Sequence, residues 1–396
     1  MPVQFCYCGA KMVEIQICKY QCPNCVPGSN ILLGDNKQIA DIDSGNMCIG
    51  VTGHVRIDKK FQRDYDGEIL RIRATGLLPI DVTPEHPLLV VHSEVKQHRT
   101  VAMSAPEWRP AREIRPKARW KGGDYVVIPR IRGCVDTETL SLAEFTNEMG
   151  VRVLQSKHLP LTIPLDDASS WFLGMYVAEG WSSPKGVVFV LNKKETDFQD
   201  RIVKIGRSLG YSPYVRESSG AAQVGVPSRV LARALPTWCG SGAPNKHVPD
   251  FILLHKQDSI LRSFLQGYLQ GDGGVSRDSW IAATVSPVLG LQLQLLCARL
   301  GITASIRQVS IEGQSEILGK SVHVHDKYHV TLYQQSKQMR VRDDTILAPV
   351  KRVESSRLRG WVYNVATADG TFLASNAVVH NCGMLWDCED VLGLPK

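Results

Sequence analysis

Two kinds of hydrophobic pattern follow one another along the chain. Residues 67–76, 122–130 and 361–381 are rich in Val, Ile and Thr or alternate apolar with polar side chains, which is typical of β-strands. Residues 171–181 and 264–275 are instead apolar stretches with helical spacing. We therefore expect β-structure towards both ends of the chain and an α+β region between them. No run of about 18 apolar residues occurs, so no membrane span is expected.

The two apolar stretches are internal repeats. Each ends in an acidic residue followed by glycine, and Glu179 and Asp272 are 93 positions apart. Glycine inside a helix costs about 1 kcal/mol relative to alanine, so glycines there indicate helices that pack closely. Such packing would place the two carboxylates side by side, where they could bind Mg²⁺. The small residues lie four positions apart on one helical face, in the pairs Gly174 with Ala178 and Gly267 with Gly271.

The sequence after each apolar stretch also repeats. Residues 187–217 and 281–310 both predict a strand, a helix and a second strand. The middle of the chain is therefore expected to be an α+β domain with two pseudo-symmetric halves. The net charge of +7 is mildly basic, which is compatible with a nucleic-acid partner but is also common among proteins without one.

The cysteines concentrate at the two ends of the chain. The N-terminus has no basic segment followed by an apolar one, so we expect no export signal, a cytoplasmic location and reduced thiols. If residues 25–381 are removed, Cys22 and Cys382 form the sequence CPNCG, whose spacing suits a tetrahedral Zn²⁺ site. Cys6 and Cys8 are candidates for a second pair. The end cysteines are Cys6, Cys8, Cys18, Cys22, Cys25, Cys382 and Cys388.

The joined product of such a removal would have 24 plus 15, or 39, residues. Chains of that length rarely fold without a metal or disulfides, which favours a structural zinc. The alternative is that these cysteines bind no metal.

The residues at the two junctions carry the chemistry for an internal excision. The Cys25 thiol can attack the Asn24 carbonyl through a five-membered ring, which converts the peptide into a thioester. Cys382 can then accept the acyl group. Cyclisation of the Asn381 side-chain amide onto its own backbone carbonyl would cut the chain, assisted by His380. An S-to-N acyl shift would finally join Asn24 to Cys382.

These junctions resemble those of inteins, the family of protein-splicing elements. The segment that begins at Cys25 resembles the intein amino-terminal block, and Thr83 and His86 in IDVTPEHPLLVV match the family's TxxH block. The resemblance implies that His86 donates a hydrogen bond to the scissile amide, that Thr83 helps to hold it, and that no cofactor is needed. It also implies an all-β, horseshoe-shaped splicing domain of the Hint type. The alternative for Thr83 and His86 is a surface loop after a strand.

The end of this region departs from the family pattern. Residues 361–381 predict a β-hairpin with its turn at Asp369-Gly370, leading to the cleavage site. Many inteins carry an Asp and a His where this chain has Asn364 and Gly370. We therefore expect the assistance of those residues to come from elsewhere, with Asp369 as the candidate, and slow splicing to follow.

The paired middle helices resemble the two LAGLIDADG helices of homing endonucleases. The resemblance implies a monomeric enzyme that cuts double-stranded DNA at a specific sequence, with Glu179 and Asp272 binding Mg²⁺. Lys246, in NKHVP, resembles a catalytic lysine near the scissile phosphate; the alternative is a surface lysine. Strands would enter the major groove. Candidate DNA contacts are Lys185, Lys193, Lys194, Arg216, Arg307 and Lys327.

Together these features predict a multidomain precursor. Splicing with an inactive endonuclease, a slowly splicing precursor of a zinc-binding host, and a zinc-binding interaction protein with inert insertions are the alternatives. The expected layout is an N-terminal flank at 1–24, a splicing domain from 25–132 and 346–381, a linker at 133–165, an endonuclease domain at 166–345, and a C-terminal flank at 382–396.

Overall fold

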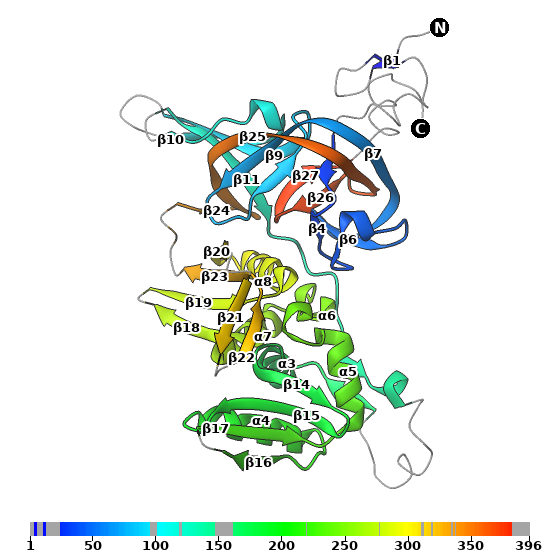
Figure 1. The fold of residues 1–396 in the computed structure, drawn as a ribbon, viewed down its shortest axis with the longest axis vertical. Coiled ribbons are helices and arrows are strands. Elements are labelled where there is room, and N and C mark those ends of the chain that lie inside the picture. Colours follow the sequence, from blue (N-terminus) through cyan, green and yellow to red (C-terminus); the bar gives the residue numbers. More distant parts are fainter. Residues whose placement is uncertain are drawn as a thin grey trace. The chain divides into compact units, whose positions relative to one another are not determined.

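The computed structural model describes residues 24–95, 101–118, 121–146, 161–218, 220–276, 278–309, 313–317, 320–333, 336 and 338–381, and the backbone of the short strands β1 (Gln4–Phe5) and β2 (Lys11–Met12). The chain forms two compact units (Figure 1). The first contains Met1–Arg132, Cys297–Arg307 and Gln334–Lys396, and the second contains Gly133–Leu296 and Gln308–Tyr333. In the described part of the chain, no helix is long and apolar enough to cross a membrane.

The first unit is built almost entirely from β-strands. Its main antiparallel sheet has 11 strands, most of them in the order β26-β27-β9-β11-β25-β7-β6. The predicted strands at 67–76 and 122–130 are confirmed as parts of β7 and β11. The first half of the unit contains β3 (Val26–Pro27), β4 (Ile31–Leu32), β5 (Lys37–Gln38), η1 (Ile39–Asp41), β6 (Met47–Gly50), β7 (Gly53–Ala74), β8 (Ile80–Val82), β9 (Pro87–Val95), β10 (Val101–Pro110), η3 (Ala111–Glu113) and β11 (Gly123–Pro129). The second half contains β24 (Arg340–Arg342), β25 (Thr345–Thr367), β26 (Thr371–Ala374) and β27 (Ala377–His380).

Two long strands join the halves of this unit. β7 and β25 pair antiparallel from Ile57↔Thr367 to Ala74↔Val350, and Figure 1 shows them side by side in blue and orange. Val, Ile and Thr favour the extended backbone, and alternate apolar side chains of both strands enter one core. Ile57, Ile72 and Val365 in that core are fully buried.

The C-terminal hairpin lies one turn later than predicted. The turn at Asp369-Gly370 leads from β25 into β26, but β26 pairs with β27, not with β25. The loop of this hairpin is Ser375-Asn376, with φ values of 49° and 66°. Two left-handed residues suit the twist of a hairpin, and Asn tolerates that conformation. Because Asp-Gly is the stronger turn signal in the sequence, the pattern indicated the wrong turn.

The second unit confirms the predicted repeat. Helix α3 (Asp167–Glu179) precedes a sheet with the order β14-β15-β17-β16, and helix α7 (Asp258–Asp272) precedes one with the order β18-β19-β23-β20. Each sheet has four strands, and the strand that comes last along the chain lies between the strands that come second and third along the chain. The remaining elements of residues 180–333 are β14 (Gly180–Ser183), β15 (Gly186–Asn192), α4 (Thr196–Ser208), β16 (Tyr214–Glu217), β17 (Ala221–Val226), α5 (Arg229–Cys239), η5 (Ala243–Asn245), α6 (Asp250–Leu253), β18 (Gly273–Ser276), β19 (Ser279–Thr284), α8 (Pro287–Arg299), β20 (Thr303–Val309), β21 (Gly313–Ile317), β22 (Lys320–Val324) and β23 (Lys327–Tyr333). Of these, the end of α8 and most of β20 lie in Cys297–Arg307, which groups with the first unit.

The expected linker and one expected boundary differ from the structure. Residues 133–165 contain β12 (Thr139–Ser141), η4 (Ala143–Thr146) and β13 (Thr162–Pro164), so this segment belongs to a folded unit. The second unit ends at Tyr333 rather than at residue 345, because β24 pairs with β25 of the first unit.

Helices α3 and α7 pack backbone against backbone, as the small residues predicted (Figure 1). A Cβ atom on Gly174 would lie 2.1 Å from the carbonyl oxygen of Phe264, and one on Gly267 would lie 2.1 Å from that of Trp171. Only glycine permits the two backbones to approach this closely, and the free energy gained by this packing outweighs the helix-propensity cost of glycine. Both helices then end at a glycine, Gly180 or Gly273, where the chain turns into a strand.

Gly267→Ala is expected to destabilise the second unit by about 1–3 kcal/mol or more, because the new methyl group meets main chain that cannot move aside. Gly274→Ala is the matched control, since a Cβ there meets nothing within 4 Å. Thermal unfolding of the intact protein by calorimetry measures both. Equal melting temperatures for the two variants would contradict the backbone packing described above.

Candidate active sites

The Asn24-Cys25 peptide bond is held from both sides. Cys25 is 4% exposed, and its N–H donates to Thr83 Oγ1 at 2.9 Å. The Thr83 N–H in turn donates to the Cys25 carbonyl oxygen at 3.0 Å. On the other side of the bond, Asn364 Nδ2 donates to the Asn24 carbonyl oxygen at 2.5 Å. The amide and the carbonyl of this peptide therefore have separate, buried partners.

Strand pairing places these partners. Thr83 follows β8, which pairs with β7, and Asn364 lies on β25 beside the Tyr363↔Val26 pair with β3. The Asn364 Oδ1 atom accepts the Val365 N–H at 2.7 Å, which orients the amide so that Nδ2 faces Asn24. Thr83 and Asn364 are each 1% exposed. The surface-loop alternative for the TxxH block is therefore wrong.

His86 lies between the two junctions. Its side chain is fully buried. Burial, and to a smaller extent the nearby His380, lowers its pKa to about 3, while the Asn24 backbone acts in the opposite direction. The ring is therefore neutral at ordinary pH. Because it interacts with both Asn24 and His380, the two ends of segment 25–381 meet around one imidazole.

The downstream junction is held in a similar way. His380 Nδ1 lies 2.8 Å from the Asn381 carbonyl oxygen, which belongs to the peptide bond before Cys382. Asn381 Nδ2 donates to the carbonyl oxygen of Thr367 at 3.0 Å, and its N–H donates to the Gly370 carbonyl oxygen at 2.9 Å. The Trp108 ring packs edge-on against His380 with centroids 4.9 Å apart. Cys382 itself lies outside the described residues.

Several buried polar atoms at the junctions lack a well-formed hydrogen bond to any other described residue. They are Asn24 Oδ1, both ring nitrogens of His86, and Asn381 Oδ1. Buried polar atoms are nearly always satisfied in folded proteins, and exceptions cluster where a reaction takes place.

The carboxylate of Asp369 binds threonines around the turn after β25. It accepts hydrogen bonds from the N–H groups of Thr52 and Thr371 and from the hydroxyl groups of Thr52, Thr367 and Thr371. It therefore shapes this turn and reaches Asn381 only through Thr367, so its catalytic role stays a prediction. Gly370 has a φ of 74°, which L-residues such as His rarely adopt.

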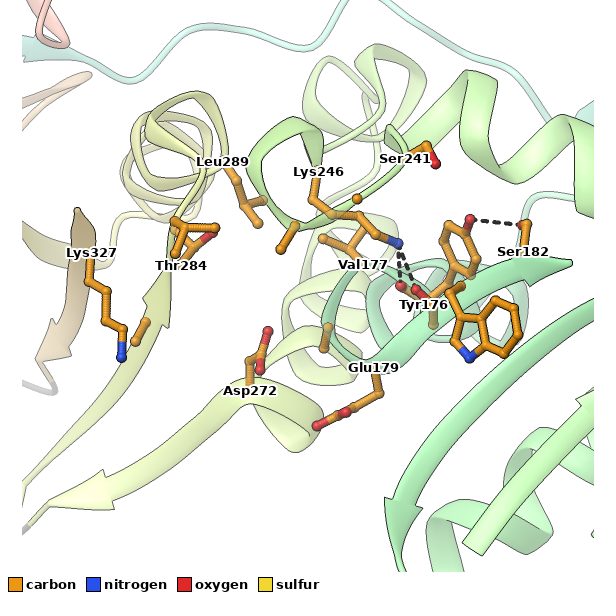
Figure 2. Close-up of a pocket in the computed structure, with 17 residues that line it drawn as sticks. Tyr176, Val177, Glu179, Ser182, Ser241, Lys246, Asp272, Thr284, Leu289 and Lys327 are labelled. Carbon is orange, nitrogen blue, oxygen red and sulfur yellow. Dashed lines mark hydrogen bonds between the residues drawn. The ribbon is translucent and has the colours of Figure 1, made fainter. Parts of the chain in front are cut away.

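A pocket of about 620 Å³ in the second unit holds the paired acids. Glu179 ends α3 and Asp272 ends α7, and Figure 2 shows both at the ends of neighbouring helices. Although Asp272 is partly exposed, its carboxyl lines the pocket. Burial there, followed by the charge of Glu179, raises its pKa to about 7. Burial also raises the pKa of Glu179.

Lys246 lies in the same pocket and is not a surface lysine. It is 7% exposed, and Nζ donates to the carbonyl oxygens of Tyr176 at 2.8 Å and Gly180 at 3.0 Å (Figure 2). The ammonium group also lies 3.6 Å from the centroid of the Tyr176 ring. Burial lowers its pKa to about 8. Lys246 thus caps the C-terminus of α3 and places positive charge near Asp272.

The six basic residues expected to contact DNA are all exposed. Lys327 differs from the others because it lines the pocket of the two acids (Figure 2).

In the described residues no group of three or more His, Cys, Asp or Glu side chains could hold a metal ion. The candidate zinc ligands Cys6, Cys8, Cys22 and Cys382, and the spare cysteines Cys18 and Cys388, lie outside the described residues.

Comparison with known proteins identifies one family within the chain. Residues 259–340, which run from α7 through β23 to the start of β24, match the LAGLIDADG-like domain family. The chain therefore contains a LAGLIDADG-like domain, and the matched residues include α7 with its terminal Asp272 but not α3.

Curated relatives match most of this chain but less than half of their own length. An ATP-dependent DNA helicase of Thermococcus kodakarensis is 27% identical over 395 residues, which cover 87% of this chain and 35% of the helicase. An iron-sulfur cluster assembly SufBD family protein of Mycobacterium tuberculosis is 26% identical, covering 90% and 43% respectively. A replication factor C small subunit of T. kodakarensis is 24% identical, covering 68% and 25%.

Solved structures align with part of the chain at low scores. The homing endonuclease I-DmoI in complex with DNA and Mn is 11% identical, with a TM-score of 0.32, and covers 42% of this chain and 90% of its own. The N-terminal LAGLIDADG domain of DUF199/WhiA is 14% identical, with a TM-score of 0.27, and covers 43% and 78%.

Three site residues escaped the sequence analysis. The sequence marks Asn364 only as a departure from a family pattern, although its amide contacts the Asn24 carbonyl oxygen. Thr367 and Trp108, which contact Asn381 and His380, carry no motif that would have identified them.

Asp272 is expected to titrate near pH 7. Glu179→Gln removes a neighbouring negative charge and should lower the pKa of Asp272, whereas Lys246→Met removes a positive charge and should raise it further. Carbon-13 NMR titration of aspartate-labelled protein measures these values, with Asp272→Asn assigning the signal. An Asp272 pKa near 4 in the wild type would contradict the crowded pocket.

Proposed function

We propose that residues 25–381 are an intein that excises itself and joins Asn24 to Cys382. One observation carries the proposal: both junction carbonyls have a side-chain partner, Asn364 Nδ2 at Asn24 and His380 Nδ1 at Asn381, and the neutral ring of His86 lies near both Asn24 and His380. Structural strands have no need for this arrangement. It is what an autocatalytic excision requires, because the reacting groups of both ends must share one site.

The first step is an acyl shift at Asn24. Cys25 Sγ bonds to the Asn24 carbonyl carbon, the C–N bond breaks, and the proton of the thiol ends on the Cys25 nitrogen. Thr83 accepts the hydrogen bond of that N–H and so orients the peptide, and His86 beside the Asn24 backbone would relay the thiol proton to the nitrogen. A neutral imidazole serves this role because it can both donate and accept a proton.

The later steps act at Asn381. After the acyl group moves to Cys382, Asn381 Nδ2 attacks its own carbonyl carbon, and the bond to Cys382 breaks. His380 contacts the carbonyl oxygen of that bond and would polarise it, while Trp108 holds the His380 ring. Thr367 fixes the attacking amide. The amine of Cys382 then takes the acyl group from its own sulfur, which restores a peptide.

The curated relatives support this proposal. A helicase, an iron-sulfur assembly protein and a replication factor subunit have unrelated names, yet each matches this chain over a fraction of its own length. One self-removing element in different hosts would produce that pattern. Residues 25–381 are 357 of 396, or about 90% of the chain, which equals the share that the mycobacterial protein matches.

The flanking segments would then form the product. We propose that the joined flanks belong to a cytoplasmic product in which Cys6, Cys8, Cys22 and Cys382 bind Zn²⁺.

We propose that the second unit is a monomeric endonuclease that cuts double-stranded DNA at the gene lacking the insertion. The LAGLIDADG-like domain and the paired acids support this. Glu179 and Asp272 fit a divalent cation, because both carboxyl groups line one pocket at the ends of α3 and α7, and the charge of Glu179 raises the pKa of Asp272. Bound Mg²⁺ would activate water and stabilise the leaving oxygen of a phosphodiester. Lys246 and Lys327 would offset the charge of the DNA backbone at the pocket.

Freshly expressed protein should contain a 357-residue fragment, Cys25 to Asn381, and the ligated 39-residue peptide. Intact-mass spectrometry under reducing conditions, with and without a zinc chelator, detects both. Cys25→Ala should prevent cleavage at Asn24, and Asn381→Ala should prevent release at Cys382. Only full-length protein after prolonged incubation of the wild type would rule out splicing under those conditions.

The intact chain should cut DNA that carries the uninterrupted host gene in the presence of Mg²⁺. Glu179→Gln and Asp272→Asn should each abolish cutting, and EDTA should do the same, because either change removes the cation. Gel analysis of linearised plasmid measures the effect, with the exposed Lys204→Ala as the control. Wild-type protein that binds this DNA without cutting it would indicate an inactive endonuclease.

A further inference from the structure

Asn364 contacts the atom where charge would develop in the first acyl shift. Its Nδ2 atom lies 2.5 Å from the Asn24 carbonyl oxygen, in a site where Asn364 is 1% and Asn24 is 8% exposed. The amide cannot easily rotate away, since Oδ1 is held by the Val365 N–H. A buried, oriented donor on a reacting carbonyl is the arrangement of an oxyanion site.

The electron balance of the step shows what this donor does. As Cys25 Sγ bonds to the Asn24 carbon, the carbonyl π pair moves onto the Asn24 oxygen and makes it an oxyanion. The pair then re-forms the double bond as the C–N bond breaks and the Cys25 nitrogen takes the proton. No other reactant enters, so stabilising this oxygen is the main way for the protein to lower the barrier.

We propose that Asn364 is the catalytic oxyanion donor of the first acyl shift in this chain, and that this position must present a hydrogen-bond donor rather than an ionised carboxylate. This inference rests on the proposed splicing function. An ionised carboxylate accepts hydrogen bonds only and would repel the forming oxyanion. Asn364 thus gives the site a donor at every pH, whereas an Asp could donate only when protonated.

A purely structural role for Asn364 would predict different behaviour. If the amide only tied Asn24 in place, its loss would disturb the fold of the first unit and affect both junctions alike. An oxyanion donor affects the upstream junction alone, because Asn381 has its own partners in His380 and Thr367. The two junctions can therefore be assayed separately in the full chain.

The upstream step is isolated by combining Asn381→Ala with Cys382→Ala. Dithiothreitol then cleaves the thioester and releases residues 1–24, which intact-mass spectrometry times. In this background Asn364→Leu, which keeps the branched shape and the number of side-chain heavy atoms but removes the donor, should slow release about 10²–10³-fold. Gln62→Leu, an exposed amide on the neighbouring strand β7, should leave the rate unchanged. Release within threefold of the parent for Asn364→Leu would overturn the proposal.

The downstream step gives the folding control. In a Cys25→Ala background, Asn364→Leu should still release residues 382–396 at the parent rate. If Asn364→Leu disturbs both junctions, Asn364→Asp decides. Its upstream rate relative to the parent should rise as the pH falls from 8.5 to 5.5, because only a protonated carboxyl group can donate. A pH-independent ratio would overturn the proposal, whereas a parent that releases neither fragment would overturn the splicing function itself.

Discussion

The antiparallel pairing of β7 with β25 is the interaction on which the first unit depends. These strands come from opposite ends of the sequence, yet they pair from Ile57↔Thr367 to Ala74↔Val350. Because side chains alternate along a strand, a slip of one residue would turn Asn364 away from Asn24 and remove the buried face of β25 from the core. The register thus sets both the stability of the unit and the geometry of the upstream junction. The same register fixes the end of β25 at Thr367, from which the chain passes through the Asp369 turn towards Asn381.

The same pairing explains how the chain accommodates a second unit. β11 ends at Pro129, which is the Cα partner of Thr345 at the start of β25, and the Arg130 N–H donates to the Asp344 carbonyl oxygen at 2.9 Å. Residues 130 and 344, which bound the intervening part of the chain, therefore lie at adjacent strand ends of the first unit. An insertion at such a point costs little, because the loop that it replaces has ends already held together by the sheet. The second unit can then build its own core around α3 and α7.

Sequence alone predicted the features that depend on residue type and short spacing. The glycine pairs of α3 and α7, the repeated strand and helix order, and the strands within β7 and β11 follow from local pattern. Features that depend on long-range register were missed. The contact between Asn364 and the Asn24 carbonyl depends on the pairing of β25 with β3. Lys246 is buried because its segment, 70 residues after Tyr176, lies against the C-terminal end of α3. The hairpin was misplaced because Ser375-Asn376 adopts a loop that its residue types signal only weakly.

The two candidate sites follow opposite electrostatic designs, and the chemistry of each accounts for the difference. The groups that contact the Asn24-Cys25 peptide are neutral: Thr83, His86 with its lowered pKa, and Asn364. In the proposed splicing reaction the charge would arise on one oxygen, and oriented neutral donors would stabilise it without repelling the ground state. The pocket of the second unit is instead lined by the ionisable groups of Glu179, Asp272 and Lys246. A phosphodiester would bring its own negative charge to this pocket, so the paired acids would serve the proposed cleavage only together with a cation. Burial and the charge of Glu179 raise the pKa of Asp272, and a bound cation would oppose that rise.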